Sequence, residues 1–221
     1  MADEILARSD KIVSAVLRSK AKTVHFIRHA EGTHNRAALA EGREAYKKEA
    51  FEDARLTELG EEQCAILRAA KPELGSEAQV VIVSPLSRAI KTAELSIGKV
   101  EGIPWIALEC ARERMGSHPC DRRRRKVTIL KEEFPFVDFN MIEHEEDALY
   151  NCIADGRETY VDLVERGREL LEFIGQRPET NIAVVSHSGF LSCLFQRVIL
   201  SPPHLSTGFL NCELRTVLLD V

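Results

Sequence analysis

Four stretches of the chain are nearly continuous in apolar residues, and we predict that they form strands. They cover residues 23–27 (TVHFI), 78–84 (AQVVIVS), 181–186 (NIAVVS) and 212–221 (CELRTVLLDV). The first three are short and rich in β-branched residues, which is typical of strands covered on both faces by helices. The pattern therefore predicts a mainly parallel central sheet.

Apolar residues at helical spacing follow between these strands. LTELGEEQCAILRAA predicts a helix with Thr57 as its N-cap, and PLSRAIKTAELS predicts one with Pro85 in its first turn. ETYVDLVERGRELLEFIGQ predicts a further helix. The apolar stripes assigned to the first and last of these helices are Leu59, Ile66, Leu67 and Ala70, and Tyr160, Leu163, Val164, Leu170, Leu171 and Ile174. Alternating strands and helices predict an α/β fold with three layers, α/β/α.

Residues 110–156 are less regular and hold much of the unusual chemistry of the chain. Long irregular connections in compact domains are usually functional or disordered, and we predict that this one is a cap-like insertion over the sheet edge. A chain of 221 residues is long enough for one α/β domain with a sizeable core. We therefore predict a single domain over residues 1–221.

Composition and charge exclude several classes of protein. A net charge of −5 gives no general attraction to nucleic acid or to anionic membranes. The six cysteines form no C-x-x-C pair, which argues against a zinc knuckle and a disulfide-stapled fold. The first residues do not resemble a signal peptide, and no apolar run reaches the roughly 18 residues that span a bilayer. We expect a cytoplasmic protein that binds neither nucleic acid nor membrane.

Three of the predicted strands lead into cationic side chains. Arg28 and His29 follow the first strand, Arg88 comes shortly after the second, and His187 directly follows the third. In an open α/β sheet, ligands bind beyond the carboxyl ends of the strands. We therefore expect these four side chains to converge on one site.

Two arginines and two histidines in one cleft repel one another, which points to a dianionic ligand such as a phosphomonoester. Arginine binds phosphate oxygens with two parallel hydrogen bonds, and His187 as an imidazolium is expected to hold a third oxygen. A neutral imidazole can also attack phosphorus, a role that suits His29. The leaving alkoxide then needs a proton, for which Glu113 in ARERMG is the candidate.

The stretches IRHAEGTHN, SPLSRAIKTA, RERMGSHPCDRRR and SHSGF resemble those of the histidine phosphatase superfamily, which has the phosphoglycerate-mutase-like fold. Within it, RHAEGTHN, GSHPCDRRR, AVVSHSGFL and NCELRTV are most similar to plant and fungal phosphoglycerate-mutase-like proteins. The likeness covers residues 24–221.

The resemblance implies a role for each site residue. It makes His29 the phosphorylated nucleophile, Glu113 the proton donor, and Arg28, Arg88 and His187 the phosphate pocket. Asn35 matches a phosphate-contacting asparagine of the family, and Ser188 is expected to contact substrate. Mutases often have serine where this chain has Gly32, so one hydroxyl contact is lost and only the Gly32 backbone amide remains to serve.

The other histidines have competing interpretations. His25 lies within the first predicted strand, and we expect it to be packed or hydrogen-bonded in the core. His34, next to Asn35, either contacts substrate or is structural. A zinc site of His25, His29 and His34 is the rival chemistry, but no acidic residue at a supporting spacing accompanies it.

A basic run and an acidic run lie in the cap-like segment. The basic run Arg122 to Lys126 is typical of a solvated helix face; near the cleft it would instead bind a second anionic group of the substrate. The acidic residues Glu143, Glu145, Glu146 and Asp147 are expected on the surface, pairing loosely with such cations. Cys120 is expected to be a buried thiol.

We predict a phosphomonoesterase that uses neither metal nor cofactor and acts on a small phosphorylated metabolite or a phosphoprotein. The alternatives are a mutase primed by a bisphosphate and a catalytically silent module that binds a phosphorylated ligand. A mutase must keep water away from the phosphoryl group, and the chain ends after its last strand, where we expect no C-terminal lid. The sequence does not determine the oligomeric state.

Overall fold

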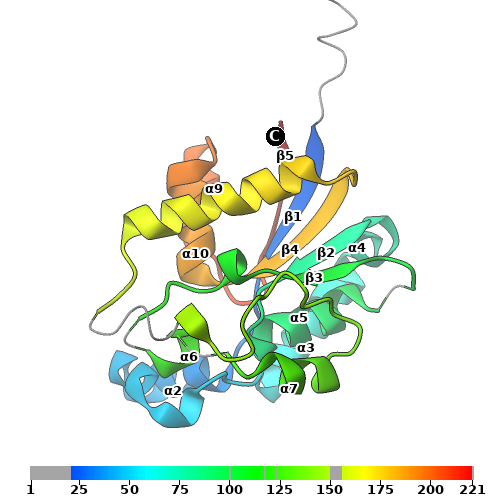
Figure 1. Ribbon diagram of the computed structural model, residues 1–221. Helices are drawn as coiled ribbons and strands as arrows, with labels where there is room; N and C mark the ends of the chain where they lie inside the picture. Colours follow the sequence, from blue (N-terminus) through cyan, green and yellow to red (C-terminus); the bar gives the residue numbers. More distant parts are fainter. Residues whose placement is uncertain (1–20, 100, 117, 123, 150–155, 221) are drawn as a thin grey trace, which may run out of the picture.

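The computed structural model describes residues 21–99, 101–116, 118–122, 124–149 and 156–220, with a five-stranded sheet at the centre (Figure 1). The strand order is β3-β2-β4-β1-β5, and only β5 runs antiparallel to its neighbour. The strands are β1 (Lys22–Arg28), β2 (Val80–Val83), β3 (Trp105–Ala107), β4 (Asn181–Ser186) and β5 (Leu214–Leu219). The predicted α/β class with a mainly parallel sheet is confirmed.

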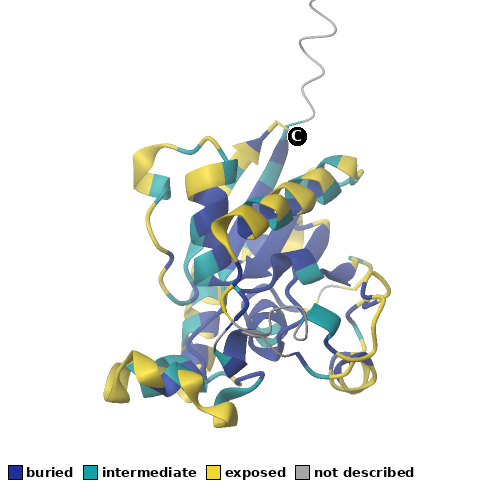
Figure 2. Ribbon diagram, turned by 60° about the vertical axis from the view of Figure 1, so that its left-hand side comes forward, coloured by how far each residue is buried: buried dark blue, intermediate teal, exposed yellow. Residues whose placement is uncertain are grey.

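The two faces of the sheet bury separate hydrophobic clusters. Val80 and Ile82 of β2 belong to one cluster, and Val81 and Val83 belong to the other, because successive side chains of a strand point to opposite faces. All four are fully buried, and Figure 2 shows the dark blue sheet between helices whose outer surfaces are exposed. Burial on both faces explains why the strand sequences are continuously apolar.

Helices cover both faces of the sheet. On one side lie α9 (Tyr160–Gln176) and α10 (Ser188–Cys193), and on the other lie α3 (Glu58–Ala70), α4 (Glu73–Glu77), α5 (Ser87–Ile97) and α7 (Val127–Glu133). The remaining elements are α2 (Thr33–Glu41), α6 (Pro119–Arg122), and the short helices η1 (Arg43–Lys47), η2 (Glu49–Phe51), η3 (Glu109–Ala111), η4 (Leu194–Val198) and η5 (Pro203–Leu205). Within the described part of the chain, no helix combines the length and apolar character needed to cross a membrane.

The edge strand β3 was not predicted. It has three residues, too few to show a periodic pattern, and its edge is extended by the backbone of Asp138. The Asp138 amide donates to the carbonyl of Trp105 at 2.7 Å, and the Ala107 amide donates to the carbonyl of Asp138 at 2.9 Å. Part of the 110–156 segment therefore runs along this edge of the sheet.

The prediction of the first helix was right in existence and wrong in detail. Thr57 is the N-cap of α3, as predicted, but Leu59 and Ile66 are exposed, and the helix buries Gly60 and Cys64 instead. A Cβ atom on Gly60 would lie 2.2 Å from the carbonyl oxygen of Glu31, so this face of α3 packs directly on backbone. Ala70 is exposed as well.

The other two helices show similar differences at their starts. Helix α5 begins at Ser87 with Leu86 as N-cap, so Pro85 lies before the helix and not in its first turn. The carboxylate of Asp53 accepts a hydrogen bond from the Ser87 amide at 2.8 Å, which caps the helix from a distant segment. In α9, Leu163, Leu170 and Ile174 are buried as predicted, whereas Tyr160 is exposed.

The basic run is not a solvated face where the structure describes it. Arg124 is buried, and its guanidinium donates to the carbonyls of His144, Glu145 and Glu146. Arg125 is half-buried and pairs with Asp53 at 2.8 Å. Arg123 and the side chain of Arg122 lie outside the described residues, as do residues 1–20. The expectation of a solvated run was therefore wrong for Arg124 and Arg125, because their charges hold the cap segment together.

The acidic run is likewise only partly on the surface. Glu143, Glu145 and Glu146 are exposed, but Asp147 is buried. Its two carboxylate oxygens accept hydrogen bonds from the Arg112 guanidinium at 2.9 and 2.8 Å. The expectation of loose surface pairing was wrong for Asp147, because this carboxylate has the fully buried Arg112 as its partner.

Candidate active site

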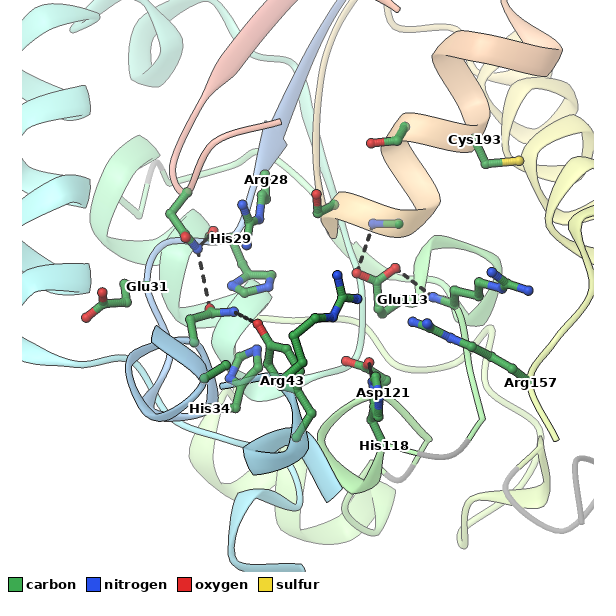
Figure 3. Close-up of a pocket in the computed structure, with 18 of the residues that line it drawn as sticks. Arg28, His29, Glu31, His34, Arg43, Glu113, His118, Asp121, Arg157 and Cys193 are labelled. Atoms are coloured by element: carbon green, nitrogen blue, oxygen red, sulfur yellow. Dashed lines mark hydrogen bonds and ion pairs between the residues drawn. The ribbon is translucent and has the colours of Figure 1, made fainter. Parts of the chain in front are cut away.

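A cavity of about 690 Å³ opens beyond the carboxyl ends of β1 and β4 (Figure 3). These strands are parallel neighbours with Arg28 paired to Ser186, so the residues that follow them come close together. The sequence-predicted residues that line the cavity are Arg28, His29, His34, Asn35, Glu113 and Ser188. The strand ends and the cap segment thus contribute to one pocket.

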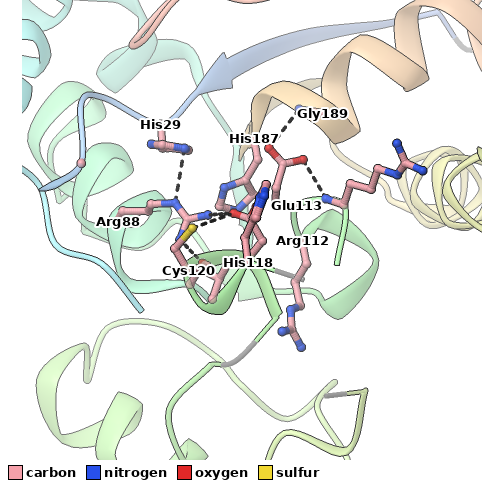
Figure 4. Close-up of polar contacts among 12 residues, drawn as sticks. His29, Arg88, Arg112, Glu113, His118, Cys120, His187 and Gly189 are labelled. Atoms are coloured by element: carbon pink, nitrogen blue, oxygen red, sulfur yellow. Dashed lines mark hydrogen bonds and ion pairs between the residues drawn. The ribbon is translucent and has the colours of Figure 1, made fainter. Parts of the chain in front are cut away.

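His29 is buried with its ring held in one tautomer. Its Nδ1 lies 2.7 Å from the carbonyl oxygen of Ala30, which can only accept, so Nδ1 carries the proton. The Nε atom of Arg88 donates to the free Nε2 at 3.3 Å (Figure 4). Burial, with the charge of Arg88 acting in the same direction, lowers the pKa of His29 well below its ordinary value. The ring is therefore neutral, with an unprotonated nitrogen available.

His187 lies beside His29, with ring centroids 5.0 Å apart. Its Nε2 is 2.8 Å from the hydroxyl of Ser84, and its buried Nδ1 has no hydrogen-bond partner among the described residues. We expected an imidazolium here. Burial, followed by the charge of Arg88, instead lowers the pKa of His187 well below its ordinary value, so this environment favours the neutral ring.

Both predicted arginines are fixed by backbone carbonyls. Arg28 donates through Nη1 to the carbonyl of Phe209 at 2.8 Å, while its buried Nε has no partner within the described chain. Arg88 is fully buried and donates through Nη1 to the carbonyl of Cys120 at 2.7 Å. Cys120 is itself buried, as expected. These contacts hold two cations beside the His29 ring.

Glu113 reaches the pocket from the loop after η3. Its carboxylate accepts hydrogen bonds from the backbone amides of Gly189 at 3.0 Å and Phe190 at 2.9 Å, and from the amide of Arg114 at 2.7 Å. The first amides of a helix have no partner within the helix, and Glu113 satisfies two of them at the start of α10. The sequence candidate for proton donor therefore lies next to the segment that carries His187.

Asn35 and Gly32 bind one another. The Gly32 amide donates to Oδ1 of Asn35 at 3.1 Å. We expected this amide to contact the ligand, but in the structure it binds a side chain of the protein. The Nδ2 atom of Asn35 lies 3.4 Å from the hydroxyl of Tyr46. Asn35 and Ser188 line the cavity, whereas Gly32 does not.

Several pocket residues had no role in the sequence analysis. Asn211, in the turn before β5, donates through Nδ2 to the carbonyl of His29 at 3.1 Å. Asp121 pairs with Arg88 at 3.1 Å and lies 3.3 Å from Nδ1 of His118. Arg43, Arg114 and Arg157 also line the cavity, and Arg43 and Arg157 are exposed. Asn211 and Asp121 lie in the stretches NCELRTV and GSHPCDRRR, which carry the family resemblance. The resemblance could therefore have pointed to both residues, but the sequence does not show which side chains they contact.

The rival zinc interpretation fails on geometry. His25 is buried in the sheet, with Nδ1 2.9 Å from the Thr216 hydroxyl and Nε2 2.9 Å from Oδ1 of Asn181, as expected for a hydrogen-bonded core histidine. His34 lines the cavity near His29 instead. Over the residues described, no group of three or more histidine, cysteine, aspartate or glutamate side chains is arranged to hold a metal ion.

Comparison with known proteins agrees with this geometry. A model of the Histidine phosphatase superfamily (branch 1) matches residues 24–220. A phosphoglycerate mutase-like protein from Arabidopsis thaliana is 36% identical over 234 residues, covering 90% of this chain and 85% of its own length. Phosphoglycerate mutase-like protein 1 from the same plant is 33% identical over 235 residues, covering 90% of this chain and 82% of its own length.

Solved structures share the fold at low sequence identity. A phosphoglycerate mutase from Bacillus anthracis matches with a TM-score of 0.61 and 18% identity, over 91% of this chain and 89% of the mutase. A mycobacterial glucosyl-3-phosphoglycerate phosphatase matches with a TM-score of 0.54 and 19% identity, over 89% of each chain. With the match to nearly the full described chain, these findings establish that the protein belongs to the histidine phosphatase superfamily, branch 1.

Proposed function

We propose that this protein is a metal-independent phosphatase that hydrolyses a phosphomonoester through a phosphohistidine at His29. The observation that carries the proposal is the hydrogen bond of 2.7 Å between Nδ1 of His29 and the carbonyl of Ala30. It leaves Nε2 unprotonated on a ring whose burial lowers its pKa. A neutral imidazole with its second nitrogen fixed in this way is a nucleophile at physiological pH.

In the first step, Nε2 of His29 forms a bond to phosphorus while the bond from phosphorus to the ester oxygen breaks. Arg28, Arg88 and the N–H of His187 stabilise the charge on the remaining phosphoryl oxygens. Glu113 gives its proton to the leaving alkoxide. In the second step, Glu113 takes a proton from water as that water attacks phosphorus, and the bond to Nε2 breaks to release inorganic phosphate.

The proposed substrate is a small phosphorylated metabolite that carries a further anionic group. Arg43, Arg114 and Arg157 line the same cavity as His29, where they would bind that group on the leaving alcohol. Arginine suits this task because its planar guanidinium binds carboxylate or phosphate with two hydrogen bonds. A cavity of about 690 Å³ has room for a metabolite larger than a bare phosphate ion.

A mutase is the second candidate, and the same three arginines favour it. A mutase holds two phosphoryl groups in one site, and these cations would neutralise the second one. The names of the Arabidopsis relatives agree with this alternative. The difference lies in the acceptor, which is water for a phosphatase and a hydroxyl of the bound product for a mutase.

The test is release of inorganic phosphate from p-nitrophenyl phosphate in EDTA by the wild type, His29→Ala and the exposed control His204→Ala. We expect turnover by the wild type and by His204→Ala, and none by His29→Ala. Quenching with alkali after a labelled substrate is added should trap an acid-labile adduct at His29. Absence of turnover in the wild type would leave a module that only binds phosphorylated ligands.

A second measurement separates phosphatase from mutase. Phosphoglycerates are incubated with the wild type with and without a bisphosphorylated primer, and inorganic phosphate and isomerised product are both quantified. A phosphatase gives phosphate without a primer. Primer-dependent isomerisation with little phosphate release would favour the mutase.

A further inference from the structure

His34 is a buried residue of the pocket that the proposed reaction does not use. It lies in the first turn of α2, is 3% exposed, and lines the same cavity as His29. The two ring centroids are 5.6 Å apart. Nδ1 of His34 is buried without a hydrogen-bond partner in the described chain, which is an unfavourable state for a polar atom unless a ligand completes it.

The ring occupies the space into which a side chain at position 32 would project. A Cβ atom on Gly32 would lie 2.6 Å from Cε1 and 2.7 Å from Nδ1 of His34. No real Cβ approaches another heavy atom so closely, so His34 in this position requires glycine at 32. The polar edge of the imidazole therefore stands where related mutases often have a serine side chain.

Neighbouring side chains hold the ring in place. Tyr46 packs against it, with ring centroids 5.8 Å apart, and His118 packs against Tyr46 at 5.3 Å. Burial lowers the pKa of His34 to about 3, with the charge of Arg88 acting in the same direction. The ring is therefore neutral above mildly acidic pH and carries one N–H to donate.

We infer that His34 is a phosphate-binding residue, which donates a hydrogen bond to a non-bridging phosphoryl oxygen and replaces the serine hydroxyl missing at position 32. The inference rests on the proposed function, since it concerns the phosphoryl group that His29 receives. It also explains why Gly32 and His34 occur together: one residue makes the space that the other fills.

The test exchanges the two donors. His34→Phe keeps a ring and removes both nitrogens, His34→Ala empties the site, and the double variant Gly32→Ser with His34→Ala returns a hydroxyl to the emptied space. The backbone at Gly32 has φ −99°, a conformation that serine adopts without strain. The readouts are the Kd for orthovanadate, kcat/KM for p-nitrophenyl phosphate and the melting temperature, with His204→Ala as the matched control.

Loss of one hydrogen bond to a charged oxygen predicts that His34→Phe and His34→Ala weaken vanadate binding by about tenfold or more. The double variant should regain most of that loss. Gly32→Ser alone should bind more weakly than the wild type, because the new side chain and the His34 ring compete for the same space. His204→Ala should bind as the wild type does.

Wild-type vanadate affinity in His34→Phe would overturn the inference, as would a double variant no better than His34→Ala. Should His34→Ala fail to fold, the comparison of His34→Phe with the wild type decides. Failure of the proposed function gives a different result. If the wild type shows neither turnover nor an adduct at His29, catalysis is refuted. If its vanadate binding still depends on His34, the contact between His34 and the anion stands.

Discussion

The guanidinium of Arg88 and the carboxylate of Asp121 form a buried ion pair of 3.1 Å, and the same guanidinium donates to the His29 ring at 3.3 Å. Although burial raises the pKa of Asp121, the hydrogen bond with His118 and the charge of Arg88 hold it below its ordinary value. Asp121 is therefore an anion, and under the proposed function it would compete with the phosphoryl group for Arg88.

The first prediction concerns this competition. Asp121→Asn should lower the free energy of unfolding by about 3–5 kcal/mol, because Arg88 loses a buried counter-charge. Inorganic phosphate can replace that charge, so it should raise the melting temperature of Asp121→Asn more than that of the wild type. Thermal unfolding with and without phosphate tests this, with the exposed Asp138→Asn as control. Equal phosphate shifts in all three proteins would contradict the competition.

A second prediction displaces Glu113 without changing it. A Cβ atom on Gly189 would lie 2.5 Å from Oε1 of Glu113, so Gly189→Ala should push the carboxylate from its position. We expect kcat/KM for an alkyl phosphate to fall by about 10²-fold, the range of a lost general acid. Gly208→Ala, where a Cβ atom meets nothing within 4 Å, is the matched control and should keep full activity. Equal activity of the two variants would argue that Glu113 is not needed.

Direct removal of the acid gives a third prediction. Glu113→Gln should slow alkyl phosphates far more than p-nitrophenyl phosphate, because a good leaving group hardly needs a proton. The glutamine –NH₂ group would also face a backbone N–H that now donates a hydrogen bond to Glu113. Because two donors cannot bind one another, this should lower the free energy of unfolding by about 1–3 kcal/mol. The kcat/KM ratio for the two substrates, measured beside a melting curve, separates the effects. A ratio equal to the wild type's would remove Glu113 from the acid role.

The cap segment supplies a fourth prediction. Asp147→Ala removes two hydrogen bonds from the fully buried Arg112, which keeps its 3.0 Å ion pair with Glu109, and should lower the free energy of unfolding by about 1.5–3 kcal/mol. Glu146→Ala, which removes an exposed ion pair with Lys126, should change stability little. Urea unfolding of the two variants tests this contrast. Similar losses in both would mean that the buried pair contributes no more than the exposed one.

The fifth prediction is a pH dependence of stability. Burial lowers the folded-state pKa of His29, His34 and His187, so below about pH 6.5 the unfolded chain binds protons that the folded chain does not. The free energy of unfolding should have its highest value above that pH and should decrease towards pH 5. The expected slope is about 1.4 kcal/mol per pH unit for each of these histidines.

Urea unfolding between pH 5 and 7 in phosphate-free buffer measures this slope, and His34→Phe should reduce it by one histidine's share. His25 in β1, whose pKa burial also lowers, adds to the slope in the same direction. Stability that stays constant from pH 7 to pH 5 would show that the pocket histidines accept protons while folded.

The sequence by itself determined the class of the fold and the end of the sheet at which the candidate site lies. Residues 181–186 were predicted as a strand with the bounds that the structure has, because a strand buried on both faces must be apolar throughout. The positions of Arg28 at the end of β1, of His29 directly after it and of His187 directly after β4 followed from the same pattern, since the carboxyl ends of parallel strands share one edge.

The tertiary structure alone decided the state of the site. Four of its features leave no periodic signal in the sequence. They are the tautomer of His29, the pairing of Arg88 with Asp121, the amides that bind Glu113 and the position of the His34 ring beside Gly32. The same holds for β3, which is too short to form a pattern, and for Arg124, whose partners are the Glu109 carboxylate and carbonyls about twenty residues away. Periodicity reports which faces are buried, whereas these contacts depend on which distant groups meet there, and only the folded chain brings them together.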